Sequence, residues 1–471
     1  MQNGSRDRGI GRYVASIIRE IAKLTPPEDL RVIVSDLFPD TIDDVLCRCD
    51  GTVTRDQVVV FHGVGPTAEM QRENAWRRHA SQLLYEDLVA RLAPDVLLIG
   101  SAMEGAGDNS IAAFPPDRSY RVATILYDLI PLINPKTHLR TPQMREWYDK
   151  RLALALASDR LLAISGSARE EAIAHTNCDP ANVTTIYAAA SSVFERAALE
   201  RDAEEDASLL AYFGIERDFI MFVSAFDSRK NFHGLVKAFA RLSPERRASL
   251  QLVLVCKIND RQREELGTFA AGLGVGEDEL VLTGFVPDED LRVLYAASSL
   301  FVFPSLHEGF GLPILEAMWC GAPAIGSSRS SVPEVIGLPE ALFDPDDLDG
   351  MAAMIERALS AGEFRDRLLA HATRHCRTFS WERTARAAIE ALHEILRDVP
   401  AKQALPLSLD DLIAKLTTWP AKGGPSGEDL ARLARAITGN LAEAAHGWAA
   451  VGAGEPSSDA TFLERAAYVG S

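Results

Sequence analysis

Two glutamates around a glycine-rich loop carry the clearest chemical signal in this sequence. Glu308 precedes the loop residues 309–311, and Glu316 follows within a short predicted helix. Glycines let a backbone approach a ligand closely and adopt positive φ. The free N–H groups at a helix start bind phosphate or sugar oxygens, and carboxylates accept hydrogen bonds from hydroxyls. This combination fits a nucleotide sugar, whereas an ordinary strand-to-helix turn with a solvated Glu316 is the alternative interpretation.

The flanking elements would hold this loop at the edge of a sheet. Residues 300–303 are a short apolar block typical of a buried parallel strand, and residues 323–326 indicate the next strand. Pro313 suits the first position of the helix between them, and Gly321 suits the residue just past its end. The pattern therefore predicts a strand, a glycine-rich loop and a helix in succession.

The run from Glu308 to Pro313, followed by Glu316-Ala317-Met318, resembles the Glu-x7-Glu signature of family 4 glycosyltransferases. The resemblance implies the GT-B fold, an α/β architecture of two doubly wound, Rossmann-like domains that face each other across a cleft. It implies that Glu308 contacts the donor hexose and Glu316 the ribose, with retention of the anomeric configuration and no essential metal. The donor site would also include the loop and helix-start residues Gly309, Phe310, Gly311 and Leu312.

The overall composition limits the function classes open to this chain. Its 471 residues are enough for two or three domains, and the hydrophobic fraction of 47% is that of a globular protein. The formal net charge of −18 argues against a nucleic-acid partner, because such binding draws on basic patches. The six cysteines lack the paired spacing of a zinc site and fit reduced thiols. With no apolar run of membrane-spanning length and no signal peptide, we expect a cytoplasmic protein, free or loosely attached to the inner face of the membrane.

The first part of the chain alternates apolar blocks with helical stretches, which favours a parallel sheet covered by helices. We predict an N-terminal Rossmann-like domain over residues 1–200, which the family resemblance implies to be the acceptor-side domain. No apolar block precedes the helix expected at residues 11–24, so we expect this domain to lack its first strand. The predicted strands lie near residues 32–34, 58–61, 96–99, 123–126 and 161–164, with helices at 73–92 and 141–157 among those between them.

Ligands of doubly wound sheets bind beyond the carboxyl ends of the strands, so the residues that follow the strands are candidates. Asp128 could contact the acceptor or the donor sugar, or it could cap the following turn. His62 occupies a similar position, and a structural role is its alternative. Gly9 and Gly11 resemble the family's glycines that approach the donor diphosphate, and an ordinary surface loop is the alternative for both.

A second alternation follows a polar, acidic stretch at residues 191–217, which we interpret as the interdomain linker. It predicts a second doubly wound domain over residues 215–378, which the family resemblance implies to be the nucleotide-sugar-binding domain. The predicted strands lie near residues 219–223, 252–255, 280–282, 300–303 and 324–325, and the helices at 231–242, 260–273 and 288–297.

Basic residues follow the first strand of this second domain. Arg229 and Lys230 would suit a diphosphate leaving group, and a solvated basic turn is the alternative. Lys230 matches a lysine of the family. Ser224 ends the same strand, and Lys257 follows the next one, where the family binds the base.

The end of the chain is less informative. Residues 379–398 resemble the family's final helix, which crosses back onto the N-terminal domain, and Trp381 would be a hinge or core residue. Beyond residue 399 the resemblance stops. Prolines and glycines interrupt helical spacing at residues 409–416 and 430–444, so we expect a linker and a C-terminal helical tail over residues 399–471.

These observations predict a glycosyltransferase that moves a hexose from a nucleotide diphosphate sugar to a glycan or lipid-linked acceptor in polysaccharide biosynthesis. Mannose is the leading sugar, because Tyr127 replaces a histidine as in a subgroup that resembles mannosyl- and polysaccharide-forming transferases. No cofactor and no metal are expected beyond the donor, and further glycosyltransferase modules are candidate partners. A sugar-nucleotide epimerase and a non-catalytic binding module of a larger glycan-assembly protein are the alternatives.

Overall fold

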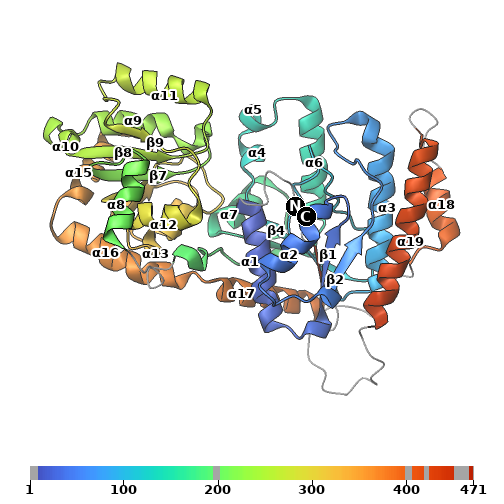
Figure 1. Cartoon of the computed structure of the whole chain (residues 1–471). Helices are drawn as coiled ribbons and strands as arrows, with labels where there is room; N and C mark the ends of the chain where they lie inside the picture. The colour runs from blue at the N-terminus through green and yellow to red at the C-terminus, as the bar shows by residue number, and fades with distance from the viewer. Residues whose placement is uncertain (1–8, 195–201, 398–405, 418–423, 450–465, 470–471) are drawn as a thin grey trace. The chain divides into compact units, whose positions relative to one another are not determined.

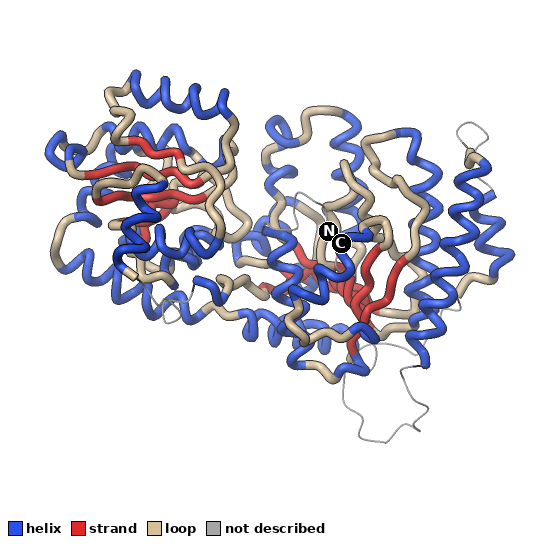
Figure 2. The backbone as a smooth tube through the Cα atoms, viewed as in Figure 1, coloured by secondary structure: helices blue, strands red, loops and turns tan. Residues whose placement is uncertain are grey.

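The computed structural model describes residues 9–194, 202–397, 406–417, 424–449 and 466–469. The chain divides into two compact units (Figure 1). Unit 1 takes its residues from 1–164, 169–186 and 381–471, and unit 2 from 165–168 and 187–380. Each unit is built on a parallel sheet surrounded by helices (Figure 2), which confirms the predicted α/β class with two Rossmann-like domains.

The sheet of unit 1 has, among the described residues, seven parallel strands in the order β2-β1-β13-β3-β4-β5-β6. Most of its strands are runs of Val, Ile and Leu because helices cover both faces. The strands are β1 (Leu30–Ser35), β2 (Val58–Phe61), β3 (Val96–Ile99), β4 (Arg121–Leu126), β5 (Arg160–Ala163), β6 (Val183–Thr185) and β13 (Ala466–Val469).

The position between β1 and β3 is taken by a strand from the other end of the sequence. β13 pairs in parallel with both neighbours, and Tyr468 stands opposite Val32 on one side and Leu98 on the other. In a doubly wound sheet this position belongs to the strand that leads into the first helix. No described strand precedes the helix α1 (Gly9–Leu24), so β13 completes the sheet at that position.

The helices of unit 1 include one that starts in the other unit, since α7 begins at Gly166 in unit 2 and continues from Arg169 in unit 1. α1 packs against α17 (Trp381–Leu396), where the rings of Tyr13 and Trp381 meet edge to face at 5.0 Å.

None of the helices in the described ranges is both long and apolar enough to cross a membrane. The remaining helices are α2 (Ile42–Arg48), α3 (Ala75–Leu92), α4 (Ile130–Ile133), α5 (Pro135–His138), α6 (Pro142–Leu156), α7 (Gly166–His175), α18 (Leu409–Thr417) and α19 (Gly427–Ala449).

The two C-terminal helices belong to the core of unit 1. Leu412 and Leu416 of α18 and Leu433 of α19 are buried in one cluster with residues of β2 and α3. α19 lies alongside α3 (Figure 1). The helices lie where the sequence predicted helical spacing, at residues 409–416 and 430–444, and the structure adds that they pack onto unit 1. Their spacing was recognisable in the sequence, but the surface that receives their apolar faces was not.

α19 also covers the edge of this sheet that is formed by β2. The side chain of Asn440 accepts a hydrogen bond from the N–H of His62 at 2.8 Å and donates one to its carbonyl oxygen at 3.0 Å. Glu443 accepts from the N–H of Val60 at 3.1 Å. Because an uncovered edge strand offers such groups to other chains, these side chains take the place of a neighbouring strand. The approach is close, since a Cβ at Gly439 would lie 2.5 Å from the His62 ring.

The sheet of unit 2 has, within the described part, six parallel strands in the order β12-β11-β10-β7-β8-β9. The strands are β7 (Asp218–Val223), β8 (Leu250–Val255), β9 (Leu280–Leu282), β10 (Leu300–Phe303), β11 (Ala324–Ser327) and β12 (Leu342–Phe343). The helices are α8 (Ala203–Tyr212), α9 (Phe232–Ala240), α10 (Pro244–Ala248), α11 (Asp260–Gly272), α12 (Asp288–Ala297), α13 (Leu312–Trp319), α14 (Val332–Ile336), α15 (Leu348–Leu359) and α16 (Glu363–His375).

The acidic part of the stretch expected to be a linker forms a helix in the structure. Asp202 is the N-cap of α8, and its carboxylate accepts from the N–H groups of Glu204 and Glu205 at 2.8 and 3.3 Å. Acidic residues in a first helical turn are stabilised by the helix dipole. The acidic residues at 202–206 therefore mark a helix start here.

Candidate active site

The predicted strand, loop and helix around Glu308 are present at the carboxyl end of β10. Gly311 is the N-cap of α13 with φ of +110°, a value that favours glycine. Pro313 lies in the first turn of the helix, and Gly321 follows its end with φ of +84°. The N–H groups at the start of α13 therefore lie next to the glycine-rich loop, with Leu312 as the first helical residue.

Lys230 and Glu308 meet in an ion pair. The Nζ atom of Lys230 lies 2.6 Å from Oε1 and 2.7 Å from Oε2 of Glu308. The two side chains are only 12% and 8% exposed, respectively. Lys230 ends the short 3-10 turn η8 (Ser228–Lys230) after β7, and β7 is the neighbour of β10 in the sheet. The parallel sheet thus joins two residues that are far apart in the sequence.

Arg229 supports the same loop. Its carbonyl oxygen accepts from the N–H of Leu306 at 2.7 Å, and its Nη1 donates to the carbonyl of His307 at 3.3 Å. Its Nε lies 3.2 Å from the carboxylate of Asp227. Asn231, which sequence reasoning did not single out, adopts φ of +56° and donates to the carbonyl of Pro304 at 3.3 Å. Asparagine is one of the few residue types that adopt this backbone conformation readily, which is the signal that could have identified it.

Glu316 is a buried residue of α13. It is 5% exposed, and the hydroxyl of Tyr295 on α12 donates to its Oε2 at 3.1 Å. The alternative of an ordinary solvated glutamate is therefore excluded. Sequence spacing could not reveal Tyr295, because it lies on another helix. The contact of Glu316 with a ribose stays a prediction.

The other residues predicted for donor binding lie around the same sheet edge or support the loop. The N–H of Ser224, just after β7, donates to the carbonyl of Val255 at 3.1 Å. Lys257 is exposed beyond the end of β8. The ring of Phe310 is buried, and its centroid lies 5.7 Å from that of the Phe379 ring. This contact packs the glycine-rich loop against the end of unit 2.

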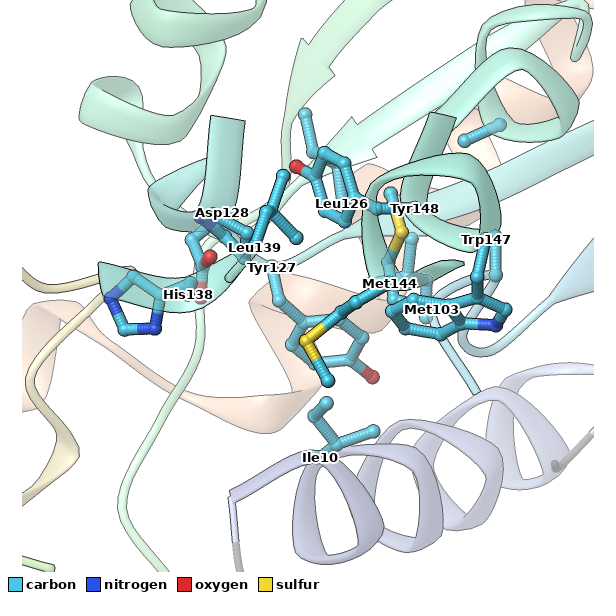
Figure 3. A pocket seen from close by; sticks show the side chains of 14 residues that line it. Ile10, Met103, Leu126, Tyr127, Asp128, His138, Leu139, Met144, Trp147 and Tyr148 are labelled. Carbon is cyan, nitrogen blue, oxygen red and sulfur yellow. The ribbon is translucent and has the colours of Figure 1, made fainter. Parts of the chain in front are cut away.

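Unit 1 has a pocket of about 280 Å³ at the ends of β3 and β4 (Figure 3). Met103, Met144 and Trp147 line one side of it, and Asp128 and His138 lie on the other. Asp128 Oδ1 also accepts from the N–H of Ile130 at 3.0 Å, so Asp128 caps the turn while it lines the pocket. The walls are otherwise mostly apolar. Sequence reasoning selected Asp128 but none of the other four.

The remaining candidates of unit 1 lie at helix α1 and at the covered sheet edge. Gly9 and Gly11 are in the first turn of α1, so the helix begins earlier than predicted, and their role in donor binding stays a prediction. His62 Nδ1 lies 2.8 Å from Asp36 Oδ2, and this hydrogen bond raises the pKa of His62 despite the partial burial of its ring. With Asn440 on its backbone groups, His62 has the structural role that was its alternative.

Comparison with known proteins assigns the chain to a family. Residues 213–375 match the family described as glycosyl transferases group 1. O-antigen chain mannosyltransferase B from Escherichia coli is 31% identical over 389 residues, which are 81% of this chain and 95% of that protein. The chain belongs to the group 1 glycosyltransferases.

This group 1 glycosyltransferase is also similar to a longer protein. The serotype-specific mannosyltransferase WbdA from Escherichia coli is 35% identical over 398 residues, which are 84% of this chain and 47% of WbdA. The chain therefore spans about half of the length of that relative.

The fold of the chain also matches that of a solved structure. HepE from Anabaena, crystallised with UDP and glucose, matches the group 1 glycosyltransferase with a TM-score of 0.58 at 17% identity. The match covers 84% of this chain and 98% of HepE. At such low identity the likeness concerns the fold, and it confirms the predicted GT-B architecture.

Proposed function

We propose that this glycosyltransferase moves a mannosyl residue from a nucleotide diphosphate sugar to a glycan or lipid-linked acceptor in polysaccharide biosynthesis. The observation that carries the proposal is the Lys230–Glu308 pair beside the start of α13. Two relatives that bear the name mannosyltransferase support the sugar. HepE, solved with UDP and glucose, supports a nucleotide sugar as donor. Membership of family 4 is part of the same proposal.

The donor would be held by unit 2. Glu308 accepts hydrogen bonds from hexose hydroxyls, and Glu316 accepts them from the ribose. The N–H groups at the start of α13 bind phosphate oxygens. Negative charge grows on the diphosphate as the glycosidic bond breaks, so the fixed ammonium of Lys230 stabilises the transition state more than the ground state. Arg229 adds a second positive charge near the same loop.

We further propose that transfer retains the anomeric configuration and needs no metal ion. The stabilising groups named above are side chains and backbone N–H groups, which can supply the positive potential that a metal would otherwise supply. In the described part of the chain, no three or more His, Cys, Asp or Glu side chains are grouped so that they could hold a metal ion. Transfer should therefore continue in EDTA, and activity that disappears with EDTA and returns with Mg²⁺ or Mn²⁺ would contradict this part.

The acceptor would enter the pocket of unit 1. Asp128 provides a carboxylate for a sugar hydroxyl, and Trp147 provides an aromatic face. A volume of about 280 Å³ is small for the site of a whole oligosaccharide, so the pocket would take the terminal sugar of the acceptor.

Incubation with labelled nucleotide sugars tests the proposed function and its two alternatives. The purified chain receives GDP-mannose, UDP-glucose or ADP-glucose together with a mannan oligosaccharide, and Glu308→Gln is the matched control. We expect a lengthened acceptor with GDP-mannose and only a small residual amount of it with the control. A donor that is converted to its epimer would show a sugar-nucleotide epimerase, and thermal stabilisation by a donor without any product would show a binding module.

A further inference from the structure

Two serines hold the Glu308 loop from the side opposite to Lys230. The N–H of Glu308 donates to Ser330 Oγ at 2.9 Å. The hydroxyl of Ser331 lies 3.1 Å from the carbonyl oxygen of Glu308 and 2.7 Å from that of Phe310. Both backbone polar groups of Glu308 are thus bound by adjacent side chains of a single segment.

The backbone of this segment shows that the contacts are built into the fold. Ser330 has φ of +50°, in the left-handed region that few residues other than glycine occupy. Such a conformation persists where the surrounding structure determines it strongly. A glycine would adopt it without strain, but glycine has no side-chain oxygen to accept from the N–H of Glu308. Ser331 is fully buried, so its hydroxyl is directed by these two carbonyl groups and not by solvent.

The segment with Ser330 and Ser331 follows a strand that neighbours β10. Ser330 and Ser331 follow β11, and Lys230 follows β7. Strands β11 and β7 are the two neighbours of β10, which leads into the Glu308 loop. Glu308 is therefore held through its backbone from one neighbouring strand and through its carboxylate from the other.

We propose that Ser330 and Ser331 are positioning residues for glycosyl transfer, which fix the backbone of Glu308 so that its carboxylate stays in place for the donor sugar. The proposal rests on the proposed function, because it assumes that Glu308 contacts the hexose. A displacement of about 1 Å in a reacting arrangement can cost a factor of about 10² in rate. Loss of one serine hydroxyl should therefore lower kcat about 10- to 100-fold, while the affinity for the free nucleotide diphosphate stays close to that of the parent.

The variants separate the backbone from the hydroxyl. Ser331→Ala removes the contacts to both carbonyl groups, and Ser330→Gly keeps the left-handed backbone while it removes the acceptor oxygen. Ser330→Asn keeps an acceptor oxygen on a residue that tolerates this backbone and should restore part of the activity. Ser328→Ala is the matched control, since Ser328 is an exposed serine of the same loop.

A double-mutant cycle distinguishes positioning from general support. If Ser331 acts through Glu308, Ser331→Ala should change the residual activity of Glu308→Gln less than about twofold, whereas two independent sites would show additive losses. Equal losses from Ser331→Ala in both backgrounds, or a near-parent kcat in the single variant, would overturn the positioning role.

Hydrogen exchange of the Glu308 amide provides a readout that needs no transfer. We expect faster exchange in Ser330→Gly and parent-like exchange in Ser328→Ala, measured by NMR on the full chain. Unchanged exchange in Ser330→Gly would overturn the proposed contacts whatever reaction the enzyme catalyses. A parent without transfer activity but with this exchange pattern would instead overturn the proposed function, and the positioning role with it.

Discussion

The Nζ atom of Lys230 lies 2.6 and 2.7 Å from the two carboxylate oxygens of Glu308. The residue proposed to bind the diphosphate and the residue proposed to bind the hexose therefore form one ion pair. Each side chain keeps the other in place before the donor arrives. Because both are largely buried, removal of either leaves an uncompensated charge at the centre of the site. Experiments on these two residues must therefore measure stability and activity together.

The first prediction concerns Lys230→Ala. We expect turnover to fall by a factor of about 10²–10³, because a fixed cation near the leaving group is lost. We also expect the free energy of unfolding to fall by about 3–5 kcal/mol, because Glu308 loses its partner. Steady-state kinetics and denaturant unfolding measure the two effects.

A charge-neutral pair of substitutions provides the control. The double variant Lys230→Met, Glu308→Gln should recover much of the lost stability but none of the activity, and Lys230→Arg should recover activity only in part. A Lys230→Ala enzyme with near-parent turnover and only a raised KM would show uniform donor binding and no catalytic role.

The second prediction concerns Glu316→Ala, which should weaken the binding of the donor nucleotide by about 1.5–3 kcal/mol in calorimetry. Tyr295→Phe is the control, because it removes the hydroxyl that donates to Glu316 and leaves the carboxylate in place. It should cost about 1 kcal/mol of stability while nucleotide affinity is largely kept. Equal affinity in the parent and Glu316→Ala would remove the ribose assignment.

The third prediction compares two helical glycines. Gly267→Ala in α11 should stabilise the protein by about 0.5–1 kcal/mol, because alanine has the higher helix propensity and its Cβ would meet no atom within 4 Å. Gly439→Ala in α19 should destabilise it, because its Cβ would lie 2.5 Å from the His62 ring. Thermal unfolding of both variants decides the question, and a stabilised Gly439→Ala would mean that α19 does not approach the sheet edge so closely.

The fourth prediction concerns pH. The hydrogen bond that His62 Nδ1 donates to the Asp36 carboxylate raises the folded-state pKa of His62 above its ordinary value of about 6.5. The stabilisation from this pair is therefore fully present below about pH 6.5 and is lost as the pH rises through the folded-state pKa. The stability difference between the parent and His62→Gln should be larger at about pH 5.5 than at about pH 9. Asp36→Asn should remove most of this dependence, and a difference that grows with pH would contradict the sign.

Local sequence patterns predicted the strands and the loop of the candidate site because these depend on neighbouring residues. The apolar runs at 58–61, 96–99 and 300–303 are strands with the predicted bounds. Lys230 and Glu308 were both placed at strand ends because parallel strands finish at one edge of a sheet.

What the sequence did not reveal depends on distant contacts. The ion pair between Lys230 and Glu308 joins two separate loops, and Tyr295 reaches Glu316 from another helix. Asn440 was not distinguishable from any polar helix residue until the edge strand beside it was known. The short segment 466–469 has no long apolar run, and its role follows only from its place between β1 and β3.

The place of β13 also orders events during synthesis of the chain. β13 follows all the other described strands in the sequence, so it is made after its neighbours β1 and β3. Unit 2 comes mostly from one continuous stretch, so its sheet can fold before β13 is available to complete the sheet of unit 1. We therefore expect the pairing of β13 with β1 and β3 to be the last step in completing this sheet, after the sheet of unit 2 has formed.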